Sequence, residues 1–146
     1  MKEFFMDKFE YDFRSNQTWV DVLVKNEDDL SDFAKKSMSH IINVHHIWIS
    51  RIIDVKAESH TWDHLPMHFW DQLMHDNLRK TIDYLEHVED TEKINYHSEE
   101  GVQLSKSSID ILYHVLNHSN YHRAQIAMEL RNLKITPPAF NFIAYH

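Results

Sequence analysis

The segment SIDILYHVLNHSNYHRAQIAMELRNL, residues 108–133, spaces its apolar side chains so that they line one face of an α-helix. Residues 2–25, 32–54 and 67–88 show the same spacing. Each segment would form a helix about 30 to 40 Å long. Four amphipathic helices of similar length bury their apolar stripes most simply against one another, so the sequence predicts an all-α fold, a four-helix bundle.

Capping signals stand at the expected helix starts. The side chain of Ser107 can accept a hydrogen bond from the backbone N–H of Asp110. Asp29 or Ser31 can cap the second helix in the same way, and Pro66 is acceptable in the first turn of the third. The sequence therefore predicts that three of the helices begin close to these residues.

A short insertion separates the third and fourth helices. Residues 93–107 read KINYHSEEGVQLSKS, where Ile94 and Tyr96 alternate with polar residues and apolar residues alternate again after a turn. The chain's only glycine, Gly101, lies in that turn, where a positive φ is useful. We predict a small hairpin or an irregular insertion here. The connections on either side of the third helix exceed ten residues, so the sequence leaves the helix topology open.

The length and charge of the chain limit its class and partners. The 146 residues suit one domain, residues 1–146, with its own core. The net charge is −8 with neutral histidines, and no cluster of Lys and Arg forms a basic stripe. Because nucleic-acid binding depends on attraction to phosphates, we expect no nucleic-acid partner.

The chain contains no cysteine, which excludes disulfides, cysteine metal ligands and a cysteine nucleophile. Any thiol chemistry would need an external thiol. No apolar run approaches about 18 residues, and the N-terminal stretch MKEFFMDKFEYDF lacks a signal-peptide pattern. We therefore expect a cytoplasmic protein with no membrane partner.

Three histidines, His114, His118 and His122, follow one another at intervals of four residues. On a helix, neighbours of this spacing can share a metal ion, but the outer two are about 12 Å apart along the axis. His122 lies roughly 70° from the centre of the apolar face, His118 about 110° and His114 about 150°. His118 and His122 are therefore the candidate pair, and His114 is expected to face solvent or another subunit.

The second helix offers His40, His45 and His46 as partners for this pair. His45 lies about 20° from the apolar centre and the other two near 120°, so periodicity predicts that His45 is buried. Periodicity does not determine which of the three meets the fourth helix. A buried imidazole bonded to a backbone carbonyl is the structural alternative for each.

The stretch HTWDHLPMHFW, residues 60–70, places three more histidines at intervals of four. Pro66 interrupts any helix there, so the spacing loses its geometric meaning. We interpret the stretch as a loop and give little weight to a second metal site. Trp48, Trp62 and Trp70 are interpreted as core residues rather than as groups that stack on a cofactor.

These motifs together resemble the DinB/YfiT-like family, the DNA-damage-inducible DinB family. The resemblance rests on SHIINVHHIW, in which His40 precedes Trp48 by eight residues, on HVLNHSNYHRAQI, and on the tail PPAFNFIAYH. It implies a four-helix bundle that holds a divalent metal ion, zinc or nickel, with three histidines. The matching positions are His40, His118 and His122, whereas periodicity leaves His45 and His46 open in place of His40.

The chain departs from the family pattern in three places. Ala124 stands where glycine is common, Ala139-Phe140-Asn141 stands where a Thr-Asp pair is common, and His45 occupies a position that is often acidic. None of these departures removes a ligand.

Three histidines leave one coordination position open, as in catalytic zinc sites. The leading hypothesis is a metal-dependent enzyme that activates a low-molecular-weight thiol or water, acting as an S-transferase or a hydrolase on a small-molecule substrate. The resemblance supports the thiol, because related proteins include thiol-dependent S-transferases and a maleylpyruvate isomerase. It also implies a homodimer.

The alternative is a non-catalytic metal-binding module of a stress response. A nuclease is disfavoured, because no set of converging carboxylates is evident.

Overall fold

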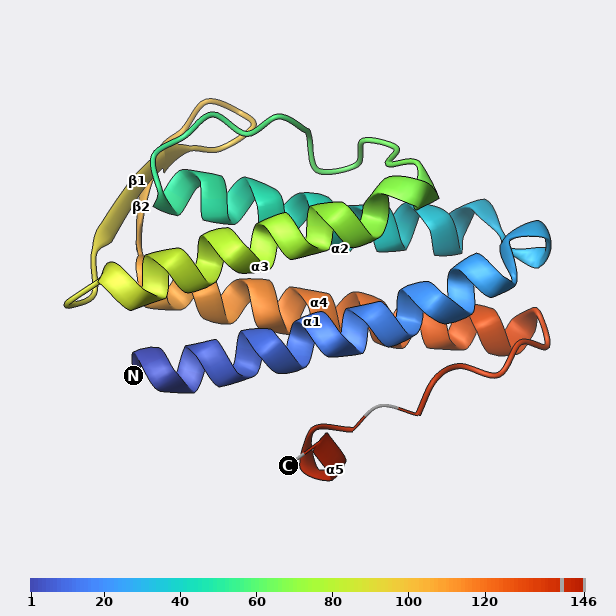
Figure 1. The fold of residues 1–146 in the computed structure, drawn as a ribbon. Helices are drawn as coiled ribbons and strands as arrows, with labels where there is room; N and C mark the ends of the chain where they lie inside the picture. Colours follow the sequence, from blue (N-terminus) through green and yellow to red (C-terminus); the bar gives the residue numbers. More distant parts are fainter. Residues whose placement is uncertain (140, 146) are drawn as a thin grey trace.

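Four long helices dominate the computed structural model, which describes residues 1–139 and 141–145. They lie side by side along their lengths (Figure 1). The elements are α1 (Lys2–Lys25), η1 (Glu27–Asp29), α2 (Asp32–Ile52), η2 (Met67–Phe69), α3 (Trp70–His87), β1 (Lys93–His97), β2 (Gln103–Ser107), α4 (Ser108–Asn132) and α5 (Phe142–Tyr145). The prediction of a mainly helical chain with a small hairpin is confirmed.

The helices differ in direction: α1 and α4 run one way, and α2 and α3 run the other (Figure 1). α1 packs on α3 and α4, and α2 packs on the same two helices. Because α2 and α3 are parallel, the connection 53–69 must return along the whole length of α2. Two hydrogen bonds hold the connection against α2. Asn43 Nδ2 donates to the carbonyl of Asp63 (2.9 Å), and the N–H of Glu58 donates to His46 Nε2 (3.0 Å).

Two apolar clusters fill the interior, one towards each end of the helices. One cluster comprises Trp19, Val20, Leu23, Ala34, Met38, Ile41, Ile42, Trp70, Met74, Ile126 and Leu130. The other comprises Phe5, Phe9, Ile49, Ile52, Leu85, Ile94, Ile111, Leu112 and Val115. Between them, each of the four helices contributes polar side chains, which we call the polar middle layer: Asp12, Asn16, His45, Asn77, Thr81, Ser119 and Arg123.

The observed helix boundaries follow the local signals closely. Ser31, rather than Asp29, caps α2 by accepting from the N–H of Ala34 (3.3 Å), and Ser107 caps α4 by accepting from Asp110 (3.1 Å). Gly101 has a φ of +81°, as its place in the hairpin turn requires. The third helix begins three residues later than predicted, because residues 67–69 form a 3₁₀ turn.

The end of the chain differs more from expectation. The short helix α5 follows the prolines and was not predicted. Phe142 and Tyr145 pack their rings on Tyr11 of α1, with centroid distances of 5.0 and 5.4 Å. Residues 139–141 are one of the places where the chain departs from the family pattern, and Phe140 among them lies outside the described residues.

None of the helices in the described part of the chain combines the length and the apolarity needed to cross a membrane.

Substitution tests the capping role of Ser107. Ser107→Ala removes the acceptor for the Asp110 N–H and should lower the free energy of unfolding by about 1 kcal/mol. Urea titration followed by circular dichroism measures the change. Ser105→Ala, two residues earlier on the exposed part of β2, is the control and should change stability by less than about 0.5 kcal/mol. Equal effects of the two substitutions would contradict the capping role.

Candidate metal centre

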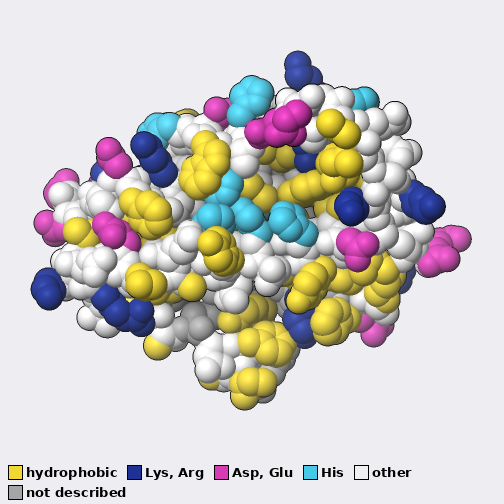
Figure 2. All heavy atoms as spheres, turned by 180° about the vertical axis from the view of Figure 1, so that it is seen from behind, with side chains coloured by type: hydrophobic (Ala, Val, Ile, Leu, Met, Phe, Trp, Pro, Cys, Tyr) yellow, Lys and Arg dark blue, Asp and Glu magenta, His cyan; other side chains and the backbone are white. Residues whose placement is uncertain are grey.

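Three imidazoles from two helices converge on one point. His40 comes from α2, and His118 and His122 come from α4. One ring nitrogen from each lies within 4.8 Å of the others, and the ring centroids are 4.4 to 4.7 Å apart. Histidine side chains gather in the middle of the face seen in Figure 2, with hydrophobic side chains around them. The structure thus brings together all three predicted residues.

Hydrogen bonds orient two of the rings. His40 Nδ1 lies 2.8 Å from the carbonyl oxygen of Thr61, which can only accept, so Nδ1 carries the proton. His122 Nδ1 lies 2.8 Å from Gln125 Oε1 and donates to it. Each bond leaves Nε2 with a free lone pair. A bond from the other ring nitrogen is the usual way in which proteins orient a histidine ligand.

The contact between His118 and His40 tests whether a cation fits. Their Nε2 atoms are 2.9 Å apart. Because Nε2 of His40 is unprotonated, a proton on His118 Nε2 makes this contact in the metal-free chain. A zinc ion about 2.0 to 2.1 Å from each nitrogen would hold the nitrogens about 3.3 Å apart, which needs only small movements. The donor set therefore fits one divalent ion.

The electrostatics keep the imidazoles neutral. Burial lowers the pKa of His40 and of His122. Burial, together with the neighbouring His122, His40 and His114, lowers the pKa of His118 to about 3. Neutral imidazole is the form that binds metal, so these rings do not have to lose a charge first. The cluster contains no carboxylate, so the positive charge of an ion would stay uncompensated.

Two exposed aromatic side chains flank the three histidines. Trp62 stacks on the His40 ring with a centroid distance of 3.6 Å and an interplanar angle of 2°, although it is 61% exposed. Tyr121 meets His122 edge to face at 5.1 Å and is 60% exposed. The prediction that Trp62 is a core residue is therefore wrong. Trp62 belongs to the connection 53–69, where helical periodicity gives no information about burial.

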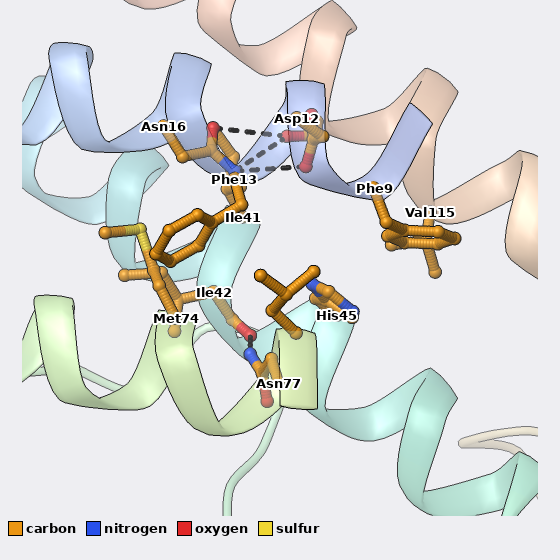
Figure 3. Close-up of a pocket in the computed structure, with 12 residues that line it drawn as sticks. Phe9, Asp12, Phe13, Asn16, Ile41, Ile42, His45, Met74, Asn77 and Val115 are labelled. Atoms are coloured by element: carbon orange, nitrogen blue, oxygen red, sulfur yellow. Dashed lines mark hydrogen bonds between the residues drawn. The ribbon is translucent and has the colours of Figure 1, made fainter. Parts of the chain in front are cut away.

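The other histidines of α2 turn elsewhere. The Thr81 hydroxyl donates to the carbonyl of Asn77, so it accepts from Nε2 of His45 at 2.8 Å. Figure 3 shows His45 among Phe9, Ile42 and other residues of a small cavity between the helices. His46 accepts from Glu58. Periodicity correctly indicated that His45 points into the protein interior. The triad, however, lies in a different direction from the axis of α2.

The remaining histidines do not form a second centre of this kind. His60, His64 and His68 are exposed, and within residues 1–139 and 141–145 the triad is the only group of three or more potential ligands. His114 is exposed, as its position on the helix predicted.

A buried ion pair lies directly behind the triad. Arg123 Nη1 donates to Asp12 Oδ1 (2.5 Å), Asn16 Oδ1 (2.7 Å) and Ser119 Oγ (2.7 Å). Arg123 is 5% exposed and Asp12 3%. Tyr121, Arg123 and Gln125 flank the histidines in the sequence, which by itself leaves them as candidates either for orienting the ligands or for surface packing. Gln125 contacts His122 directly, whereas Arg123 fixes the helix that carries His122.

Comparison with known proteins gives a match to a family. A model of the DinB family matches residues 13–146, a range that includes all three histidines. Among curated proteins, no sequence matches at a significant level.

The ion pair provides a stability prediction. Asp12→Ala leaves the Arg123 guanidinium buried without its carboxylate and should lower the free energy of unfolding by about 3 to 5 kcal/mol. The double variant Asp12→Ala with Arg123→Met should recover a large part of this loss, because no buried charge remains. Chemical denaturation measures both variants. A double variant no more stable than Asp12→Ala would contradict the explanation.

His45 provides a pH prediction. Burial lowers its pKa to about 4, although Asp12 opposes this shift. Between about pH 6.5 and 4, His45 is protonated in the unfolded chain but neutral in the folded chain. The stability that neutral His45 supplies is therefore fully present above about pH 6.5. It should fall by up to about 3 kcal/mol as the pH drops through 4. His45→Gln should reduce this dependence in urea titrations between pH 7 and 4. His97→Gln, at an exposed position of β1, should leave it unchanged.

Proposed function

The chain belongs to the DinB family, and on that premise we propose that it is a metal-dependent enzyme whose ion is held by His40, His118 and His122. One observation carries the proposal: three neutral imidazoles from two helices turn a ring nitrogen towards one point. We further propose that the four long helices are the family's four-helix bundle, with α2 and α4 as its metal-bearing pair.

Zinc or nickel is the proposed ion, and when bound it would act as a Lewis acid that lowers the pKa of a thiol or water in its vicinity. The histidines contribute no negative charge, so they would leave the ion strongly electrophilic. Three protein ligands also leave room for a small molecule, as in catalytic zinc sites.

The residues around the triad have distinct roles in this proposal. Thr61 and Gln125 hold the His40 and His122 rings so that their lone pairs face the ion. Trp62 covers one face of His40, which excludes water from that side. Tyr121 contacts the His122 ring edge to face and so borders the site.

The proposed reaction uses a low-molecular-weight thiol or water as the nucleophile on a small electrophilic substrate. An S-transferase reaction would need an external thiol, since the chain has no cysteine. With water, the same site would act as a hydrolase. A homodimer, a cytoplasmic location and the absence of a nucleic-acid partner stay predictions.

The second candidate is a non-catalytic metal-binding module of a stress response. It is favoured by the position of the triad, which would join α2 and α4 through the ion and thereby stabilise the fold by mass action. Both candidates predict that a chelator lowers the melting temperature. Only the enzyme predicts turnover and an ion that exchanges its non-protein ligand.

Metal content is the primary test. Elemental analysis of untagged protein should find about one divalent ion per chain, and His118→Ala should lose it. His114→Ala is the matched control, because His114 lies one helical turn away on the same helix and outside the triad. Full metal content in His118→Ala would rule out this site.

Gln125→Ala tests the orientation of the ligand. Loss of the acceptor for His122 Nδ1 should weaken metal binding about 10- to 100-fold. Competition with a chromophoric chelator measures the affinity. Glu129→Ala, one turn further along α4, should leave it unchanged.

Activity is tested on protein loaded with zinc or nickel, incubated with low-molecular-weight thiols and an electrophile such as 1-chloro-2,4-dinitrobenzene. Conjugation should depend on the metal and be lost in His118→Ala. Stable metal binding without conjugation or hydrolysis would favour the non-catalytic module.

A further inference from the structure

A cleft of about 360 Å³ lies next to the triad, within the size range of small-molecule sites. It is formed by Trp48, Tyr96, Lys106, Asp110, Ile111 and His114. None of these residues is a candidate metal ligand. The cleft therefore has its own walls, built from the end of α2, the hairpin and the first half of α4.

The cleft and the triad are joined through His114. Its ring lies 5.8 Å from His118 along α4 and 5.6 Å from Trp48 across the cleft. His114 is one helical turn from His118, a rise of about 6 Å. A molecule held against Trp48 that extends past His114 by one turn would reach the triad.

The aromatic walls are fixed before any ligand binds. Trp48 and Tyr96 meet edge to face, with centroids 5.1 Å apart and an interplanar angle of 83°. The Arg51 guanidinium lies over both rings, 4.5 Å from the centroid of Trp48 and 4.7 Å from that of Tyr96. Cation–π contacts of this kind restrict both side chains, so a ligand would lose little affinity to their ordering.

The charges lining the cleft balance. Lys106 and Asp110 both line it, one of each sign, and the charge of Arg51 is directed at the Trp48 and Tyr96 rings, so the lining residues themselves carry no net charge that would select an ionised ligand. The rest of the lining is aromatic, aliphatic or imidazole. Flat aromatic walls favour an aromatic ring over a saturated one, because ring pairs gain stabilisation beyond the area that they bury.

We propose that this cleft binds an uncharged aromatic portion of the substrate and directs its reactive end past His114 to the triad. The inference rests on the proposed function for the role of the triad, but not for the binding itself. It assigns the substrate to the class of small aromatic compounds that carry an electrophilic substituent.

Binding is tested on metal-free protein with 1-naphthol as the probe and its saturated analogue, decahydro-1-naphthol, by calorimetry and by NMR shifts of the Trp48 indole N–H. 1-Naphthol should bind about three- to tenfold more tightly than the saturated alcohol. Tyr96→Ala removes one wall and should weaken 1-naphthol binding about tenfold. Leu104→Ala is the matched control, because Leu104 pairs with Tyr96 across the hairpin but does not line the cleft, and it should change affinity less than about twofold.

The position of bound 1-naphthol relative to the triad is tested with Co²⁺, a paramagnetic substitute for the proposed ion. Protons of bound 1-naphthol should relax faster in wild-type protein loaded with Co²⁺ than with Zn²⁺, and this difference should vanish in His118→Ala. Equal binding of the two alcohols, or equal affinity of Tyr96→Ala and Leu104→Ala, would overturn the cleft proposal. Binding without paramagnetic relaxation in Co²⁺-loaded protein would overturn the link to the triad. Failure of Co²⁺ to bind would instead contradict the proposed function, and the metal-free titration would still decide the cleft.

Discussion

The buried pair of Arg123 and Asp12 constrains the rest of the structure more than any other interaction. A guanidinium that is 5% exposed is tolerable only beside a carboxylate and further acceptors, and α1 supplies both Asp12 and Asn16. This requirement fixes the rotation of α4 about its axis. Because successive residues on a helix point about 100° apart, an Arg123 turned towards α1 directs His122 away from α1, towards α2. The position of two candidate ligands thus depends on an ion pair that includes none of the three histidines.

The polar middle layer shows how the interior combines stability with a functional centre. Apolar clusters at both ends of the helices supply the burial that stabilises the fold, and the polar residues between them are satisfied by one another, as in the bonds from His45 to Thr81 and from Asn77 to the carbonyl of Ile42. Satisfied networks of this kind give a core a single arrangement, since any slip along a helix leaves polar groups unpaired. The triad lies at the level of this layer, where helix positions are most strictly determined.

The long connection 53–69 completes the centre. It is required because α2 and α3 are parallel, and its course along α2 brings Thr61 against His40 and Trp62 over the same ring. The hydroxyl of Thr61 also donates to Glu99 in the hairpin turn (2.7 Å), so the connection and the hairpin are joined beside the candidate centre. The connection and the hairpin, both outside the long helices, therefore shape the approach to the three candidate ligands.

The sequence by itself predicted the four long helices, the Ser107 cap, the small insertion before α4 and the candidate pair His118 and His122, because each follows from periodicity or from contacts within four residues. Periodicity gives the direction of a side chain relative to its own helix axis, so it placed His45 inward and His114 outward. Periodicity could not select His40, because the place of His40 in the triad depends on which face of α2 meets α4. Only the family resemblance pointed to His40. Thr61, Trp62 and the partner of Arg123 were decided by tertiary structure alone. Their contacts join residues far apart in the chain, and a loop has no repeating pattern from which its side-chain directions can be predicted.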